Sequence, residues 1–365
     1  MKNSQSQVYS IQGLRGLAAL AVVIAHSLEH GKLGGVPALF TGRFGVEIFF
    51  VISGFVITLA SGNGRFSPSN FAIRRFMRVV PLYWITTLLV AGLAIVLPSM
   101  FKNTTFDILY FIKSLAFVPD PLPGTNDWRP LFKLGWTLNY EMFFYAIVCT
   151  LFWCRTGLIR SVCLISIMIV LIFGSFGVEI RSGIPAFYLN LNLMPFAAGV
   201  VICEAFRQRP TLMEGVSPYF PFLVVVAIGS IYWALQYSHE EYRALPGHLA
   251  LTSAAVSVVL TALSAERFFK RSGALWSWLG NISYSLYLLH MFIVGAGWAI
   301  IRRMAHGQSE AIITSSGILA IIIISLVAAT ISYKLFEVPL AKIAKAVTGK
   351  SGRFSAKAPV IAPAA

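Results

Sequence analysis

Ionisable side chains stand inside apolar stretches of this sequence, where they could carry acid–base chemistry. His26 follows Arg15 by eleven residues within the apolar stretch 11–29. Eleven residues of an α-helix return to nearly the same face about 16 Å further along, so we expect both side chains on one stripe. Such groups in a membrane helix usually face a partner or a cavity. A snorkelling arginine and a hydrogen-bonded core histidine are the structural alternative, and spacing alone leaves both open.

Two carboxylates and a second histidine stand in other apolar stretches. Glu141 lies a little over one turn inside its stretch, at a depth that could match that of His26. A carboxylate beside a histidine favours the basic form and fixes the tautomer, which a general base requires. Glu47 lies about one turn inside the second stretch, and His290 lies near the middle of the ninth. For His290, a hydrogen-bonded core histidine is an equally good interpretation.

Three arginines, Arg74, Arg75 and Arg78, come just before the third apolar stretch. Arg75 and Arg78 are spaced i and i+3, so they share a face of a helix. Guanidinium groups suit phosphate recognition, and the pair could clamp a phosphorylated ligand. The alternative is a cytoplasmic anchor of positive charge, with Pro81 at the start of the membrane helix.

Nucleophile and metal motifs have little support in the sequence. Ser53 and Gly54 lie near the middle of the second stretch, where this pair more often serves helix packing. There is no GxSxG motif, so a serine hydrolase is not indicated. The four cysteines lack the spacing of metal ligands, and we expect them to be packing residues in a protein without a metal site.

The elements that carry these residues are predicted to be membrane helices. Hydrophobic residues make up 57% of the chain and charged residues 12%, whereas soluble domains carry about 25% charged residues. Since lipid offers the backbone no hydrogen bonds, long apolar runs must be helices. We therefore predict an all-α, polytopic membrane protein of about ten transmembrane helices. The expected spans are 11–29, 44–60, 79–98, 136–154, 158–174, 186–205, 218–236, 246–264, 279–301 and 311–333.

Charge and composition predict the topology and the ends of the chain. With the N-terminus inside, the inner segments hold 19 of the 29 Lys and Arg residues, which favours cytoplasmic termini at both ends. The net charge of +15 then reflects topology and attraction to anionic membrane lipid, and needs no nucleic acid. The apolar segment 106–118 is too short to span. We predict a membrane domain over 1–340 and a disordered cytoplasmic tail over 341–365, where Ala, Pro, Lys and Ser prevail beyond Lys342.

In their order and spacing these stretches resemble the acyltransferase 3 family of integral membrane acyltransferases. Residues 135–145 look like the branch that O-acetylates exopolysaccharides. The resemblance covers about residues 10–340. The matching pieces are Arg15-x10-His26, Phe-Phe-Val-Ile-Ser-Gly-Phe at 49–55, Arg75-x-x-Arg78 with Pro81 and Tyr83, Gly-Trp-Thr-Leu-Asn-Tyr-Glu-Met-Phe-Phe-Tyr at 135–145, Ser-Tyr-Ser-Leu-Tyr-Leu-Leu-His at 283–290, and Phe336-Glu337-x-Pro339.

The resemblance implies transfer of an acyl group, usually acetyl, from cytoplasmic acyl-coenzyme A to a carbohydrate hydroxyl. The acceptor would be a cell-surface or exported polysaccharide or a lipid-linked oligosaccharide, and the protein would lie in a bacterial inner membrane. His26 would be the essential histidine with Arg15 as its partner. Arg74, Arg75 and Arg78 would bind the donor, acetyl-CoA.

A mechanism follows as a hypothesis. His26, oriented by Glu141 or Glu47, removes the proton of the attacking hydroxyl, which contributes typically about 10²–10⁴-fold. The developing oxyanion receives hydrogen bonds from Ser53, Tyr140 or a tyrosine of the ninth helix. We place Glu47, Ser53, Tyr140 and His290 at the substrate. A covalent acyl-histidine relay would use the same residues.

Two other classes of function are weighed against the acyltransferase. A proton-coupled transporter could also use intramembrane His and Glu residues as a proton relay. The sequence shows no internal repeat and no paired broken helices of the kind transporters have. A non-catalytic membrane scaffold would not explain His26 and Glu141 inside apolar stretches.

Overall fold

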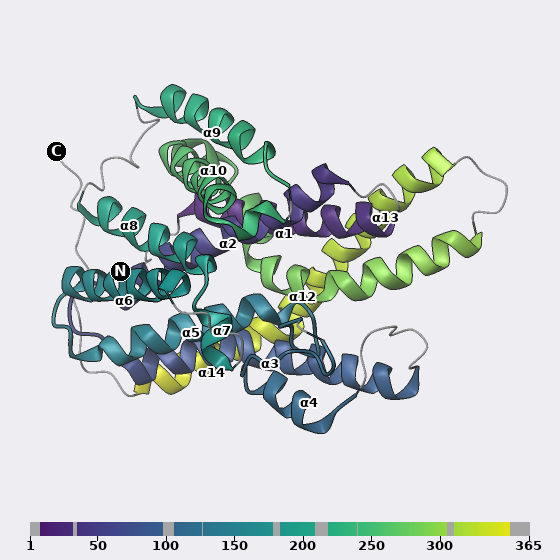
Figure 1. The fold of residues 1–365 in the computed structure, drawn as a ribbon, viewed down its shortest axis with the longest axis horizontal. Helices are drawn as coiled ribbons and strands as arrows, with labels where there is room; N and C mark the ends of the chain where they lie inside the picture. The colour runs from purple at the N-terminus through teal and green to yellow at the C-terminus, as the bar shows by residue number, and fades with distance from the viewer. Residues whose placement is uncertain are drawn as a thin grey trace. The chain divides into compact units, whose positions relative to one another are not determined.

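Helices make up all the regular secondary structure that the computed structural model describes (Figure 1). Within these residues the chain divides into two compact units. The first unit holds residues 1–53 and 194–335, and the second holds 54–193 and 336–365. The structure describes residues 8–31, 35–97, 106–125, 127–177, 183–208, 218–238, 240–304 and 310–350.

The first unit is built around the packing of α1 against α12. Helices α9 and α10 pack against each other, α13 packs on α12, and α10 also touches α1 and α8. Helix α2 (Val36–Ser61) contributes its residues up to Ser53 to this unit. The other helices of the unit are α1 (Tyr9–His30), α8 (Met194–Gln208), α9 (Phe220–Leu235), α10 (Leu245–Ser264), α11 (Glu266–Arg271), α12 (Gly273–Met304) and α13 (Glu310–Ser332).

The second unit is centred on α3, which packs against α5, α14 and α4. A short π-helix, Tyr333–Glu337, leads from α13 into α14. The last residues of α2 also belong to this unit. Its other helices are α3 (Pro68–Val96), α4 (Ile108–Leu115), α5 (Gly135–Thr150), α6 (Gly157–Gly177), α7 (Ile184–Tyr188) and α14 (Val338–Lys350).

Close contact between α1 and α12 depends on glycine. A Cβ atom on Gly280 would lie 2.5 Å from the backbone oxygen of Gln12, and one on Gly16 would lie 2.2 Å from the Leu279 side chain. Small residues at such positions let membrane helices approach closely, since lipid gives helices little hydrophobic reason to associate. Gly16 and Gly280 therefore allow α1 and α12 to pack closely.

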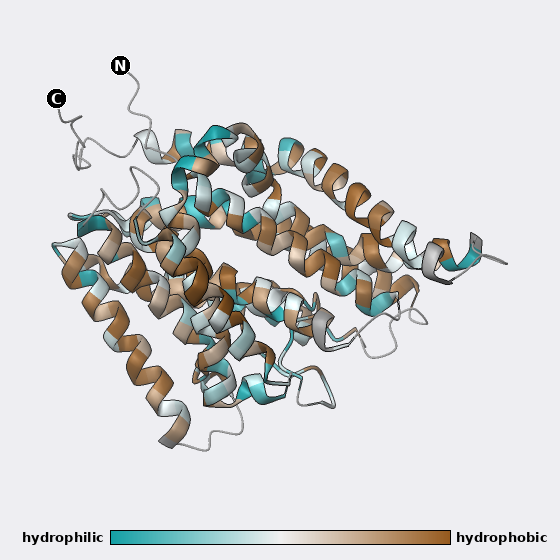
Figure 2. Ribbon diagram, turned by 90° about the horizontal axis from the view of Figure 1, so that it is seen from above, coloured by the Kyte–Doolittle hydropathy of each residue, from teal (hydrophilic) through white to brown (hydrophobic). Residues whose placement is uncertain are grey.

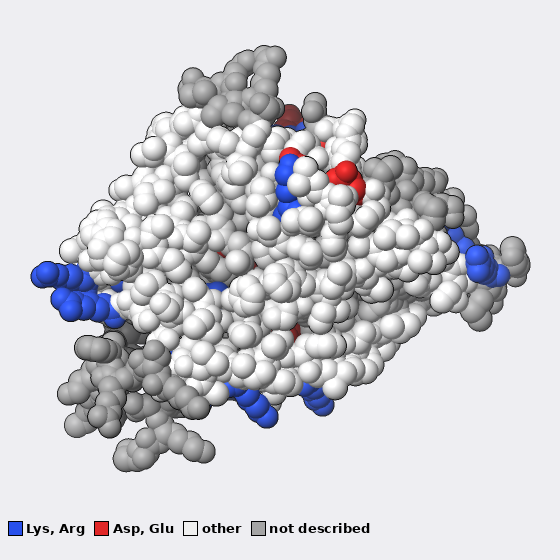
Figure 3. All heavy atoms as spheres, turned by 90° about the horizontal axis from the view of Figure 1, so that it is seen from below, with Lys and Arg blue, Asp and Glu red and all other residues white. Residues whose placement is uncertain are grey.

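The prediction of a polytopic membrane protein is confirmed. Among the described residues, seven helices are long and apolar enough to cross a membrane, and α9 is a shorter apolar helix. Apolar residues cover most of the helix length in Figure 2. Large side chains such as Leu88, Phe173 and Val225 remain exposed on helix surfaces, which suits lipid better than water. Charged side chains cover only small, separate areas of the face drawn in Figure 3.

Three local expectations differ from the structure. Pro81 does not start a helix but lies inside α3, which begins at Pro68 with the Ser67 side chain accepting a hydrogen bond from the Asn70 backbone. The expected span 186–205 is broken near Asn190 and Asn192 into α7, a short 3₁₀ turn and α8. Neighbouring helices can supply the packing that lets such breaks persist.

The third difference concerns the end of the chain. Residues 341–350, expected to be disordered, form most of α14. This helix packs against α3, and Ala344 and Thr348, four residues apart, are buried. Hydropathy alone missed this stripe because its buried residues are small. The remainder of the predicted tail, 351–365, lies outside the described residues.

Candidate functional site

The packing of α1 and α12 brings His26 and His290 together in the first unit. Their ring centroids lie 5.4 Å apart with an angle of 28° between the ring planes, so the rings are stacked. His290 is fully buried, and its Nδ1 donates to the backbone oxygens of Tyr287 at 2.7 Å and Leu286 at 3.2 Å. This assigns the proton to Nδ1 and a lone pair to Nε2. Nε2 is buried without a hydrogen-bond partner among the described residues.

His26 itself is partly buried and contacts a carboxylate of its own helix. Its Nδ1 lies 3.2 Å from Oε2 of Glu29, and the two side chains are 21% and 54% exposed. Residues three apart are neighbours on a helix surface, so the pair follows from the regular geometry of α1. Sequence analysis missed Glu29, although the spacing His-x-x-Glu was visible. Arg15 lies three turns earlier on the same helix and is also partly buried.

Glu47 lies in a second polar cluster of the first unit. Its side chain is fully buried, and its Oε1 accepts a hydrogen bond of 2.6 Å from Thr252 of α10. Nε2 of His248, one turn earlier on α10, lies 3.6 Å from the same oxygen, and Nδ1 of His248 is 3.1 Å from the backbone oxygen of Tyr242. The other oxygen, Oε2, is buried without a hydrogen-bond partner among the described residues. Thr252 and His248 stand about 200 residues from Glu47, so no sequence spacing pointed to them.

The second unit gathers Glu141, Tyr145 and Arg75. The Tyr145 hydroxyl donates a short hydrogen bond to Oε1 of Glu141, one turn earlier on α5. The Arg75 guanidinium lies 5.8 Å from the Tyr145 ring centre and 5.5 Å from that of Phe71. Arg75 also interacts electrostatically with Glu141 and with Arg78. A carboxylate and two aromatic faces therefore offset the charge of this arginine, which lies in an apolar helix.

The neighbouring arginines point to different partners. Arg78 is exposed and interacts electrostatically with Arg75, as expected for residues that share a face of one helix. It also interacts electrostatically with Tyr145 of α5. Arg74 donates from Nε to the Thr348 hydroxyl of α14 at 3.1 Å. The predicted shared face of Arg75 and Arg78 is thus present, whereas Arg74 contributes to the packing of α3 against α14.

Tyr140 and Ser53 stand in different surroundings. Tyr140 is buried in the second unit, where its hydroxyl donates to the Phe187 backbone oxygen at 2.7 Å and accepts from the Asn192 amide at 3.2 Å. These bonds tie α5 to the broken segment around Asn192. Ser53 is partly buried in α2, six residues after Glu47, at the end of the first unit.

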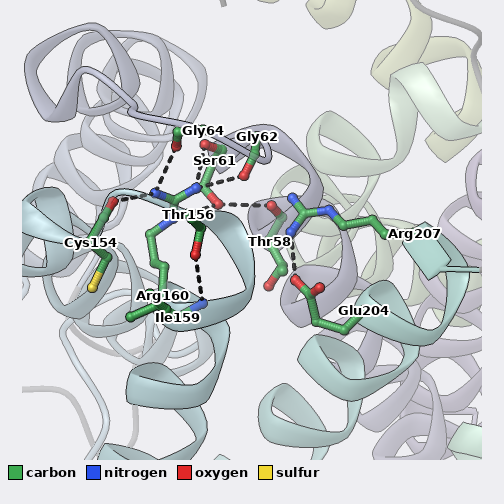
Figure 4. Close-up of polar contacts among 10 residues, drawn as sticks. All are labelled: Thr58, Ser61, Gly62, Gly64, Cys154, Thr156, Ile159, Arg160, Glu204 and Arg207. Atoms are coloured by element: carbon green, nitrogen blue, oxygen red, sulfur yellow. Dashed lines mark hydrogen bonds and ion pairs between the residues drawn. The ribbon is translucent and has the colours of Figure 1, made fainter. Parts of the chain in front are cut away.

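Arg160 is a buried charge that sequence analysis counted only as a topology signal. It is 2% exposed and stands in the first turns of α6 (Figure 4). The guanidinium lies 4.7 Å from the Phe66 ring centre. It donates to the backbone oxygens of Ser61, Gly62, Gly64 and Cys154 and to the Ser61 hydroxyl, at 2.6–3.4 Å.

Arg160 therefore caps the end of α2. A helix leaves its last carbonyl groups without partners, and Ser61 is the last residue of α2. The next residue, Gly62, has a φ of +73°, which favours glycine and turns the chain away. Through this turn Arg160 holds the connection that leads into α3 and its arginines. The figure also shows Arg207 of α8, which pairs with Glu204 at 2.5 Å.

The structure thus brings some predicted residues together and leaves other pairings as predictions. His26 meets His290 in the first unit, and Glu141 meets Arg75 in the second. His26 belongs to the first unit and Glu141 to the second, so the orientation of His26 by Glu141 stays a prediction. Glu47 is held by Thr252 and His248. No cluster of three or more His, Cys, Asp or Glu side chains suited to a metal occurs within the described residues.

Comparisons with known proteins show which family this chain matches. A family model described as an acyltransferase domain matches residues 8–334, which include all of these helices except α14. The exopolysaccharide production protein ExoZ of Rhizobium meliloti is 32% identical over 71% of this chain and 80% of its own length. The acyltransferase MdmB of Streptomyces mycarofaciens is 24% identical over 92% of each chain. The peptidoglycan O-acetyltransferase OatA of Listeria monocytogenes is 30% identical over 40% of this chain and 24% of its own. No solved structure matches.

Proposed function

The chain belongs to the acyltransferase 3 family, and we propose that this membrane O-acetyltransferase moves acetyl from acetyl-CoA to a carbohydrate hydroxyl. Relatives named for exopolysaccharide production and for peptidoglycan O-acetylation support a carbohydrate acceptor. The acceptor would be a cell-surface or exported polysaccharide or a lipid-linked oligosaccharide. The observation that carries the proposal is the position of His26, partly buried on α1 against His290, within the matched residues.

The reaction assigns His26 the role of general base. The acceptor hydroxyl gives its proton to His26 as its oxygen forms a bond to the thioester carbonyl carbon. The carbon–sulfur bond then breaks, and the proton passes from His26 to the departing coenzyme A thiolate. Arg15, also on α1, is the proposed partner of His26. A covalent acyl-histidine would use the same atoms in two steps.

The other predicted residues receive roles around this step. His290 offers a buried Nε2 next to His26, and we place it with Glu47 and Ser53 at the acceptor. Tyr287 of α12, whose ring centroid lies 6.0 Å from that of His290, is the tyrosine of the ninth predicted span that suits the developing oxyanion. Tyr140 can donate to the oxyanion only when its hydroxyl releases the hydrogen bond to the Phe187 backbone oxygen.

Donor binding is proposed for the arginines of α3. Arg75 and Arg78 share a face, and guanidinium groups suit the phosphates of coenzyme A. Glu141, proposed earlier as a catalytic residue, lies where it would also hold Arg75 through Tyr145. Arg74 would add positive charge near the phosphates.

The membrane arrangement is also part of the proposal. We infer about ten transmembrane helices, with α5, α8 and α9 crossing in addition to the seven long spans. Both termini, including residues 341–365, would be cytoplasmic, in the inner membrane of a bacterium. The excess of Lys and Arg in the inner segments supports this topology.

A His26→Ala variant tests the proposal. The purified protein is supplied with acetyl-CoA and with polysaccharide from a bacterium that lacks this chain, and release of free thiol is measured. NMR of the polysaccharide then counts O-acetyl groups. The wild type should release thiol in step with O-acetylation, and the variant should lose at least about 100-fold in turnover. Retained turnover in a folded His26→Ala protein would remove His26 as the base.

Arg75→Gln separates the donor site from the base. This variant should raise the KM for acetyl-CoA with a smaller change in kcat, because a phosphate contact contributes mainly to binding. A change confined to the choice of acceptor would contradict the donor role. The competing transporter would instead move a solute with protons and release no thiol from acetyl-CoA.

A further inference from the structure

We propose that Glu29 is a positioning residue for His26, an inference that rests on the proposed function. The contact that suggests it is the 3.2 Å separation between Oε2 of Glu29 and Nδ1 of His26. Both side chains stand on the last two turns of α1, three residues apart, so the helix itself sets their spacing.

The contact determines which nitrogen of His26 can act as the base. A carboxylate accepts hydrogen bonds, so Nδ1 of His26 carries a proton and donates a hydrogen bond to Oε2 of Glu29. In the neutral ring the lone pair is then on Nε2. His290 stacks on the face of His26 with 28° between the ring planes, whereas the lone pair of an imidazole nitrogen lies in the plane of its ring. The geometry therefore points to Nε2 of His26 as the atom that takes the hydroxyl proton.

Helix stability does not explain a glutamate at this position. Glu29 stands in the last turn of α1, where a negative charge is unfavourable beside the partial negative charge of the helix end. Its carboxylate is more than half exposed, and exposed ion pairs contribute little to stability. The role that fits its position is to orient the imidazole and stabilise the imidazolium that forms during transfer.

The surrounding contacts hold this turn of α1 in place. Trp298 of α12 donates from Nε1 to the Ser27 backbone oxygen at 3.0 Å, and Arg302 donates to the backbone oxygen of His30. His30 in turn contacts the His26 backbone oxygen through Nδ1 at 3.0 Å. The charged or titratable side chains that contact this turn of α1 include Glu29, His30, His290 and Arg302. With the backbone anchored, a change at Glu29 acts on the His26 side chain rather than on the fold.

The test compares Glu29→Gln with Glu240→Gln. Glu240 is a matched control in the same unit, since it is exposed and pairs with Arg243 at the same i, i+3 spacing and a distance of 3.2 Å. Glu29→Gln should lower kcat by about 10-fold or more, a part of what a general base contributes. The KM for acetyl-CoA and the thermal midpoint should stay at wild-type values. Glu240→Gln should change none of these quantities.

A double variant links the effect to His26. If Glu29 acts through His26, then Glu29→Gln should cause no further loss of turnover in a His26→Ala background. An equal kcat for Glu29→Gln and Glu240→Gln, with His26→Ala inactive, would overturn the role of Glu29 and leave the proposed function intact. A further loss in the His26→Ala background, or a raised KM with unchanged kcat, would also overturn it. An active His26→Ala protein would overturn both.

Discussion

Replacing Arg160 with methionine should destabilise the second unit more than any neighbouring loss of positive charge. Methionine keeps much of the length and apolar volume of the side chain but has no donor. The change leaves five acceptors without the guanidinium, among them the Gly62 and Ser61 backbone oxygens at 2.6 and 2.8 Å. The Phe66 ring loses its cation at the same time.

The size of the effect follows from these contacts. A hydrogen bond from a charged donor contributes about 1.5–3 kcal/mol, and a buried acceptor left unpaired costs about 1–3 kcal/mol. The buried guanidinium has itself lost its hydration, which offsets part of this gain. A cation near a helix end changes stability by about 0.3–1 kcal/mol. Here the two effects nearly cancel, because the charge of Arg160 is unfavourable at the start of α6 and favourable at the end of α2. We expect a loss of about 3–5 kcal/mol in the free energy of unfolding, which is less than the sum of five contacts because the variant no longer buries a charge.

The native cysteines provide the assay. Cys154 and Cys203 are buried and Cys149 and Cys163 are partly buried, so a thiol-reactive dye reports unfolding in detergent. Arg155→Met is the matched control, because Arg155 is exposed five residues earlier in the same connection. Arg160→Lys, which keeps the charge with fewer and differently placed donors, should fall between the two.

If Arg160→Met unfolds at the same temperature as Arg155→Met, the five hydrogen bonds do not hold the end of α2. A destabilised Arg160→Met protein with an unchanged KM for acetyl-CoA would show that this turn does not position the arginines of α3. We expect both a lower unfolding temperature and a higher KM.

Three further predictions concern other buried contacts. Gly280→Ala should destabilise the α1–α12 contact by about 1–3 kcal/mol, because the added Cβ meets the backbone of Gln12, and thermal unfolding would detect this. Tyr140→Phe should cost about 1–3 kcal/mol in unfolding with kcat nearly unchanged, and a fall in kcat of about 100-fold would instead make its hydroxyl an oxyanion donor. Thr252→Val should cost a similar amount by removing the donor to Glu47, and no loss of stability would contradict the 2.6 Å bond.

The sequence predicted well those features that depend on neighbouring residues. Hydropathy located α1, α2, α6, α10 and α12, because lipid requires each span to satisfy its own backbone. The span 186–205 was predicted as one helix and is broken in the structure, although Asn190 and Asn192 already interrupt its apolar run in the sequence. The shared face of Arg75 and Arg78 followed from helix geometry alone.

Features that join distant parts of the chain were not predictable in this way. The pairing of Glu47 with His248 crosses about 200 residues, and that of Arg160 with Ser61 crosses 99. The stripe that holds α14 on α3 consists of small residues such as Ala344, which hydropathy does not single out. Pro81 matched the usual signal for a helix start, yet α3 begins earlier, at Pro68, and includes Pro81.

By itself, then, the sequence determined the helical membrane class, the helices that carry His26, Glu141 and the arginines, and the resemblance to the acyltransferase 3 family. Helix period and hydropathy are local properties, and they fix which residues share a face. Which of these faces meet depends on the tertiary packing of the helices. This packing stacked His290 on His26, placed Glu141 with Tyr145 and Arg75, and turned Arg160 onto the end of α2, because such contacts depend on how helices pack and not on their spacing along the chain.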